Sequence, residues 1–97
     1  MSYKLRIRLA AQAEAARIHD WYEARSKGLG GRFADALEEC LQSIQRNPTG
    51  LQIRKGKYRH DLVSRFPYRV VYTLDGDTVF VYQIRHTSRR PSKPFGP

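Results

Sequence analysis

The sequence is poor in the residues that cross-link a small domain or hold a metal. Its 97 residues include a single cysteine, Cys40, which excludes an internal disulfide and a cysteine-rich zinc site. Long apolar runs are also missing, because no segment approaches the roughly 20 residues of a membrane-spanning helix. The first residues, MSYKLRIRL, alternate and do not form the apolar block of a signal peptide. We therefore expect a cytoplasmic protein that does not bind membranes, uses no metal or cofactor, and depends on an apolar core.

Acidic residues are scarce too. Nine Asp and Glu residues stand against 18 Lys and Arg residues, for a net charge of +9. Residues 1–50 carry eight basic and six acidic side chains, whereas residues 51–97 carry ten and three. This imbalance favours an anionic partner, either nucleic acid or an acidic protein, and puts the binding chemistry in the second half of the chain.

The length and composition indicate one domain. A chain of this size can bury well over half of its unfolded surface in a single core. We assign residues 1–91 to the domain and residues 92–97, which are rich in proline and carry a lysine, to a flexible tail. The chain contains no internal repeat.

The first half of the domain predicts a strand and a helix. Apolar and basic residues alternate from Tyr3 to Leu9, the period-two pattern of a half-buried strand. The stretch 10–26 is rich in alanine and other good helix formers. The apolar stripe of this helix consists of Ala11, Ala15, Ile18 and Tyr22, widened by Trp21.

A second helix follows a glycine-rich break. The run Gly28-Leu29-Gly30-Gly31 should end the first helix, because glycine tolerates the left-handed backbone found at helix ends. Asn47-Pro48 should end the second helix. The apolar stripe of the second helix consists of Phe33, Leu37, Cys40, Leu41 and Ile44. Two amphipathic helices with a short connection predict a helical hairpin.

The second half predicts a three-stranded antiparallel meander. The strands are expected at 57–66, 68–74 and 78–85, with Asp75-Gly76 as a two-residue type I′ turn between the last two. One sheet, formed by the N-terminal strand and the meander, would then pack on the helical hairpin. The predicted fold class is therefore α+β.

The turn also predicts which residues share a face of the sheet. If Asp75 and Gly76 form the loop, the expected cross-strand pairs are Tyr72 with Val79, Val70 with Val81, Arg69 with Tyr82, and Arg65 with His86. The face toward the helices would hold Tyr68, Val70, Tyr72, Val79 and Val81. The opposite face would hold Arg65, Arg69, Val71, Phe80, Tyr82, Ile84 and His86, apolar in the middle and cationic at one end. A bulge would move every residue beyond it to the other face.

The order of these motifs resembles a known family. GLGGRF, a helix ending in NP, FPYRVVY and a last strand ending in RHTSRRP are similar to the RelE/ParE superfamily of toxins from toxin-antitoxin systems. The resemblance covers residues 3–91. It implies a small α+β domain, an antitoxin whose C-terminal segment wraps the toxin in a hetero-oligomer, and one of two activities. RelE-like members cut mRNA in the ribosomal A site, whereas ParE-like members poison DNA gyrase.

The RelE-like activity would be enzymatic. Cleavage of RNA by its own 2′-hydroxyl needs a base, an acid and positive charge at the phosphate, and arginine supplies only the charge. The resemblance implies that Arg69 contacts the phosphate and that Arg59 is a second basic residue. His86 would then be the acid or base, with Asp61 positioning it or acting as base. The RelE pattern is incomplete, since Asp61 stands where a lysine is typical and no tyrosine follows RHTSRRP.

The ParE-like activity would need no catalytic residues. FPY before the third strand and H-T-S-R at the end of the last favour this branch, in which Arg85, Arg89 and Arg90 would meet gyrase or its bound DNA. The other residues expected to bind a partner or nucleic acid are Arg65, Arg69, Tyr82 and His86. The sequence thus favours a non-enzymatic gyrase inhibitor, and the ribosome-dependent nuclease is the alternative.

The antitoxin should be acidic. Its apolar helix or strand would cover Val71, Phe80, Tyr82 and Ile84 while its carboxylates meet the arginines. A plainer explanation of the same residues is that the arginines are solvated charges and that His86 bonds a backbone carbonyl.

Overall fold

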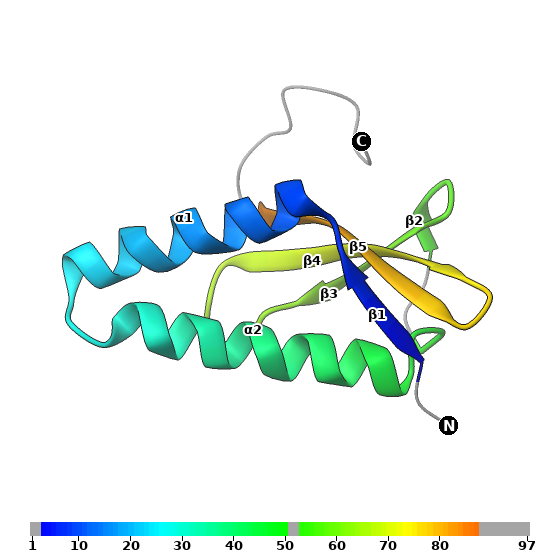
Figure 1. The fold of residues 1–97 in the computed structure, drawn as a ribbon, viewed down its shortest axis with the longest axis horizontal. Helices are drawn as coiled ribbons and strands as arrows, with labels where there is room; N and C mark the ends of the chain where they lie inside the picture. Colours follow the sequence, from blue (N-terminus) through cyan, green and yellow to red (C-terminus); the bar gives the residue numbers. More distant parts are fainter. Residues whose placement is uncertain (1–2, 51–52, 88–97) are drawn as a thin grey trace.

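The computed structural model describes residues 3–50 and 53–87 and shows an α+β domain (Figure 1). In chain order the elements are β1 (Lys4–Ile7), α1 (Leu9–Arg25), α2 (Leu29–Arg46), β2 (Ile53–Lys55), β3 (Tyr58–Leu62), β4 (Tyr68–Asp75) and β5 (Thr78–His86). The predicted strand, helical hairpin and meander are confirmed. β2 was not predicted, because a strand of three residues is too short to show a period. The proposed tail, 92–97, lies outside the described residues.

The sheet brings the first and last strands together. Its order is β1-β5-β4-β3-β2. β1 is parallel to β5, with Leu5 opposite Val79, and the other neighbours are antiparallel. A parallel pair needs a long connection, and here it includes both helices, which cover the same face of the sheet (Figure 1). None of the described helices covers the opposite face.

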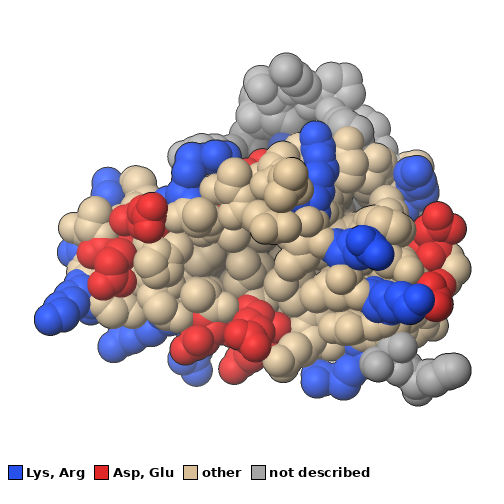
Figure 2. All heavy atoms as spheres, viewed as in Figure 1, with Lys and Arg blue, Asp and Glu red and all other residues tan. Residues whose placement is uncertain are grey.

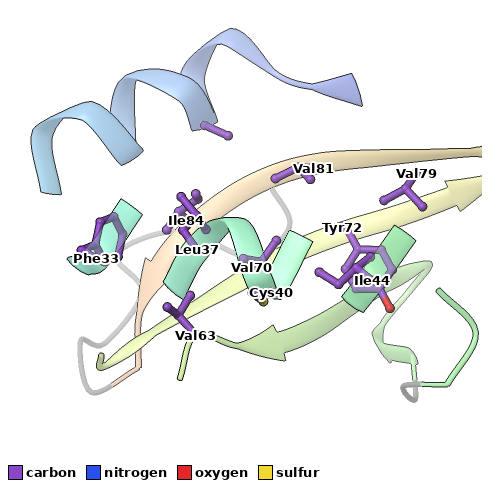
Figure 3. Close-up of a cluster of buried hydrophobic side chains, with 11 residues drawn as sticks. Phe33, Leu37, Cys40, Ile44, Val63, Val70, Tyr72, Val79, Val81 and Ile84 are labelled. Atoms are coloured by element: carbon purple, nitrogen blue, oxygen red, sulfur yellow. The ribbon is translucent and has the colours of Figure 1, made fainter. Parts of the chain in front are cut away.

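The core lies between α2 and the central strands (Figure 3). Its buried residues from α2 are Phe33, Leu37, Cys40 and Ile44, and those from β4 and β5 are Val70, Tyr72, Val79, Val81 and Ile84. The predicted stripe of α2 is therefore confirmed, with Leu41 partly buried at its edge. The hydroxyl of fully buried Tyr72 donates a hydrogen bond of 2.7 Å to the carbonyl of Pro48. This bond satisfies a polar group that would otherwise destabilise the core.

α1 packs through the predicted stripe, except at Trp21. Ala11 is fully buried, and Ala15, Ile18 and Tyr22 contact the core. Trp21 does not widen this face, because half of its surface is exposed and the Arg25 guanidinium lies 3.4 Å from its ring centroid. In a helix, Trp21 points about 100° away from Tyr22, toward the side of α1.

The break between the helices is shorter than predicted. Only Gly28 leaves the helical conformation with a positive φ, 87°, and α2 already begins at Leu29. The Glu23 carboxylate accepts hydrogen bonds of 2.9 Å from the backbone N–H groups of Gly28 and Gly30. The two oxygens of this carboxylate thus satisfy backbone N–H groups at the start of α2 that have no partner within the helix.

The turn between β4 and β5 also differs from the prediction. Asp75 pairs with Thr78, so the loop consists of Gly76 and Asp77, and only Gly76 has a positive φ, 60°. A type II′ turn has this pattern, because it needs positive φ at its first loop position alone. Leu74 therefore lies opposite Val79, and the predicted pairs are wrong.

A β-bulge then shifts the register once more. Tyr72 pairs with Val81 but Val71 pairs with Gln83, which leaves Tyr82 as the extra residue. Up to this point the predicted helix-facing residues hold, since Val70, Tyr72, Val79 and Val81 are all buried in the core.

Beyond the bulge, the predicted faces are wrong. Ile84 pairs with Val70 and His86 with Tyr68, so both side chains lie on the helix side of the sheet. Arg85 pairs with Arg69 on the other side. The single extra residue has exchanged the faces of these three β5 side chains.

Candidate functional site

The face of the sheet opposite the helices carries the cationic and aromatic side chains, and we call it the open face. Its members on the strands, together with Arg8 just after β1, are Lys4, Arg6, Arg8, Tyr58, His60, Leu62, Arg69, Val71, Thr73, Asp75, Thr78, Phe80, Tyr82, Gln83 and Arg85. Directly opposed strand residues project to the same side, so these side chains form rows across β3, β4 and β5.

One row is cationic. Arg69 of β4 lies between Leu62 of β3 and Arg85 of β5. In the next row, the His60 ring nitrogen Nδ1 lies 3.1 Å from an Arg69 guanidinium nitrogen, which can donate to it. Partial burial and the neighbouring Arg69 hold the pKa of Arg85 below its usual value. Two guanidiniums beside one imidazole are a suitable arrangement for contacting anionic groups.

The other end of the face is aromatic. The rings of Tyr58 and Tyr82 meet edge to face with centroids 5.3 Å apart, and the Arg8 guanidinium lies 4.3 Å from the Tyr82 centroid. Phe80 lies beside them and is 38% exposed. These residues, with Arg6, Lys57 and the acidic Asp75, line a groove of about 760 Å³. An exposed apolar groove with a basic rim is suited to binding a protein segment.

Charge is distributed differently on the helix side of the molecule. Figure 2 shows acidic groups over α1, over α2 and at the β4–β5 turn, interspersed with basic ones. On the open face, by contrast, the strand members include four arginines and one lysine against a single carboxylate, that of Asp75 at the end of β4. The open face is thus the more uniformly basic of the two.

Comparison with known proteins identifies the family. Residues 5–91 match the model of the ParE toxin of the type II toxin-antitoxin system parDE. The chain belongs to this ParE toxin family. No curated protein sequence matches it significantly.

Solved structures agree with the ParE-family fold. A chromosomal ParDE toxin-antitoxin system from P. aeruginosa matches with a TM-score of 0.76 at 16% identity, covering 90% of this chain and 98% of that one. A mutant of E. coli toxin RelE in the free state matches with a TM-score of 0.68 at 19% identity, covering 91% and 86%. The RelBE2 toxin-antitoxin complex from Mycobacterium tuberculosis matches with a TM-score of 0.63 at 19% identity, covering 89% and 92%. At these identities the likeness shows the fold alone.

The structure of this ParE-family chain separates the predicted catalytic residues. Arg69 lies on the open face, whereas Arg59 pairs with buried Tyr72, and His86 pairs with Tyr68; both lie on the helix side. The rings of His86 and Tyr68 meet at 5.1 Å. Asp61, paired with Val70, also lies on the helix side. The predicted grouping of Arg59, Arg69 and His86 is therefore wrong.

The predicted partner-binding residues are partly brought together. Arg69, Tyr82 and Arg85 share the open face. Arg65 does not, because it lies in the exposed turn between β3 and β4 with a positive φ of 71°. His86 lies on the helix side, and Arg89 and Arg90 lie outside the described residues. Of the predicted apolar trough, Phe80 is exposed and Tyr82 is partly exposed, whereas Val71 is fully buried and Ile84 is buried in the core.

Sequence reasoning missed several residues of this face. His60 alternates with Arg59 and Asp61 and so must point away from them, a signal that was present in the period-two pattern. Arg6 and Arg8 alternate with the apolar residues of β1 in the same way. What the pattern did not reveal is that β1 lies next to β5, which places both arginines beside Phe80 and Tyr82.

The described residues form no metal centre. Within 3–50 and 53–87, no three His, Cys, Asp or Glu side chains are placed to hold a metal ion. None of the helices in these ranges is long and apolar enough to cross a membrane.

Proposed function

We propose that this ParE-family toxin arrests growth by binding DNA gyrase in the cytoplasm through the open face, and that an acidic antitoxin neutralises it by covering the same face. The observation that carries the proposal is the separation of Arg69 from His86, on opposite sides of the sheet. A nuclease built on these residues would need both at one phosphate. A binding surface needs only cations and exposed apolar groups on one side, as Arg69, Arg85 and Phe80 supply.

The open face suits an acidic antitoxin segment. Buried apolar area at Phe80 and Tyr82 would stabilise the complex, while carboxylates opposite Arg69 and Arg85 would speed association. Two of the similar structures are toxin-antitoxin systems, which supports a toxin-antitoxin hetero-oligomer. A role in plasmid stabilisation would follow from such a pair when it is carried on a plasmid.

A supercoiling assay tests the gyrase proposal. The purified chain should inhibit supercoiling by gyrase or lead to accumulation of cleaved DNA. The double variant Arg69→Gln, Arg85→Gln should lose this effect, whereas Arg32→Gln, an exposed cation on α2, should keep it. Normal supercoiling at every toxin concentration, by a chain shown to be folded, would refute the proposal.

The contact between His60 and Arg69 favours a second candidate, ribosome-dependent RNA cleavage. With Nδ1 accepting from Arg69 at 3.1 Å, a neutral His60 ring carries its proton on Nε2. This nitrogen is buried in the free domain, so it would reach a leaving oxygen only if RNA binding exposed the ring. Arg69 and Arg85 would stabilise the charge on the phosphate. The test is mRNA cleavage on purified ribosomes: His60→Ala should abolish it and His86→Ala should not. Absence of ribosome-dependent cuts would exclude this candidate.

A further inference from the structure

A second cavity lies on the helix side of the sheet, between α1 and the ends of β4 and β5. Its volume is about 460 Å³, which falls in the range of small-molecule sites, roughly 300–1,000 Å³. The residues that carry its chemistry are Glu14, Arg17, Trp21, Tyr22, Tyr68, Ile84 and His86. This cavity is separate from the open face.

One wall of the cavity is aromatic. The Trp21 and Tyr22 rings meet edge to face at 5.1 Å, and Tyr22 meets Tyr68 at 6.4 Å. Trp21 is half exposed, and the Arg25 guanidinium lies 3.4 Å from its ring centroid, which leaves a ligand at most one face of the ring. Aromatic side chains of this kind offer a surface on which a planar heterocycle can stack.

A fixed carboxylate lies in the same cavity. Oε1 of Glu14 accepts a hydrogen bond of 3.0 Å from the backbone N–H of Ile84, on β5. This bond ties α1 to the strand and holds the side chain in one orientation. A carboxylate has further lone pairs, so the anchored group can still accept from a ligand.

Arg17 adds a positive charge to the aromatic and acidic side chains of this cavity. Arg17 follows Glu14 by three residues and precedes Trp21 by four, a spacing that places all three on one side of α1. Among the described residues Arg17 forms no salt bridge. The cavity therefore combines an aromatic surface, an acceptor and a cation along one helix.

We propose that this cavity binds a guanine nucleotide. The base stacks against Trp21, its adjacent N1–H and N2 amino donors meet the Glu14 carboxylate, and the phosphate meets Arg17. Adenine, cytosine and uracil lack this pair of neighbouring donors, so the carboxylate selects guanine. The proposal adds a ligand site to the toxin and does not depend on which target the open face binds.

The only tryptophan of the chain gives the experiment its signal. Guanosine 5′-monophosphate titrated into the full chain should quench Trp21 emission saturably, with adenosine 5′-monophosphate binding about tenfold more weakly because it lacks the donor pair. A short RNA with a single guanine serves as a parallel probe. If the RNA binds more tightly than the free nucleotide, the natural ligand is a guanine within a strand; if the free nucleotide binds more tightly, it is a free nucleotide. Isothermal titration of both probes excludes simple light absorption by the base. Absence of saturable binding of either probe would overturn the proposal.

Matched variants separate the site from general attraction to a basic protein. Arg17→Gln should weaken the binding of the nucleotide about tenfold or more, and Arg32→Gln on α2 should leave it unchanged. Glu14→Gln keeps an oxygen for Ile84 and should remove the preference for guanine over adenine. Circular dichroism should show that all three variants are folded. Equal weakening by Arg17→Gln and Arg32→Gln, or the same quenching by inorganic phosphate, would show that the site does not exist.

Discussion

Arg69 and Arg85 lie directly opposite each other on β4 and β5, on the same side of the sheet. Like charges in this arrangement destabilise the free domain, so a ligand that brings negative charge between them is favoured twice, by attraction and by relief of repulsion. We predict that the double variant Arg69→Gln, Arg85→Gln slows association with the cognate antitoxin and flattens the salt dependence of kon. Stopped-flow mixing measures both quantities. Association as fast as that of the unchanged chain at low salt would show that the antitoxin does not meet this pair.

The bulge at Tyr82 predicts unequal costs for two apolar residues of β5. Ile84 is 5% exposed in the core, whereas Phe80 is 38% exposed on the open face. Ile84→Ala should lower the free energy of unfolding by about 2–5 kcal/mol, and Phe80→Ala should lower it by clearly less. Urea denaturation followed by circular dichroism measures the difference. The opposite ranking would mean that the register beyond the bulge is wrong.

Gly30 and Gly31 should respond oppositely to the same substitution. A Cβ at Gly30 would lie 2.7 Å from the His19 carbonyl oxygen, whereas a Cβ at Gly31 meets nothing within 4 Å. Gly30→Ala should therefore destabilise the domain by about 1–3 kcal/mol through overpacking. Gly31→Ala should be neutral or stabilise it by up to about 1 kcal/mol, since alanine is the better helix former. Thermal unfolding of the two variants side by side tests the close approach of α1 and α2.

Glu23 should make the stability of the helical hairpin depend on acid. The backbone N–H groups of Gly28 and Gly30 hold the pKa of Glu23 below its ordinary value of 4.5. A lowered folded-state pKa gives stability that is present above the unfolded-state pKa and is lost as the pH falls through the folded-state value. We expect Glu23→Gln to be less stable than the unchanged chain near neutral pH and the difference to shrink below about pH 4.5. Chemical denaturation over a pH series measures it; a difference that does not change with pH would contradict the role of the charge.

Cys40 should be unreactive in the folded protein. Burial in the core, with a smaller effect of Asp61, raises the pKa of its thiol to about 12. The thiolate is the reactive form, so labelling by a disulfide reagent at pH 8 should be slow in buffer and fast in denaturant. Rapid labelling of the native chain would show that α2 separates from the sheet on the time scale of the reaction.

The sequence predicted those features that depend on local period. The stripe Phe33, Leu37, Cys40 and Ile44 follows from helical spacing alone, and all four are buried. Which side chains share the open face depends on the pairing register of β4 and β5, and register is set by contacts between residues distant in the sequence. The turn lies one residue later than predicted, which changed the cross-strand pairs but not the faces, and the one extra residue at Tyr82 was enough to move His86 and Ile84 to the other side of the sheet. The bulge could not be predicted from the residue types, because it lies at Tyr82 and contains no glycine.

The parallel pairing of β1 with β5 has a consequence for the order of folding. Lys4 of β1 pairs with Thr78 of β5, so β1 cannot join the sheet until residues far apart in the sequence have come together. Contacts of such high sequence separation form slowly. On a translating ribosome, the helical hairpin can assemble while β5 is still unsynthesised. The surface that gathers Arg6, Arg8, Tyr82 and Arg85 comes into existence only with the final pairing. If the open face inhibits growth as proposed, a chain interrupted before β5 would lack that activity.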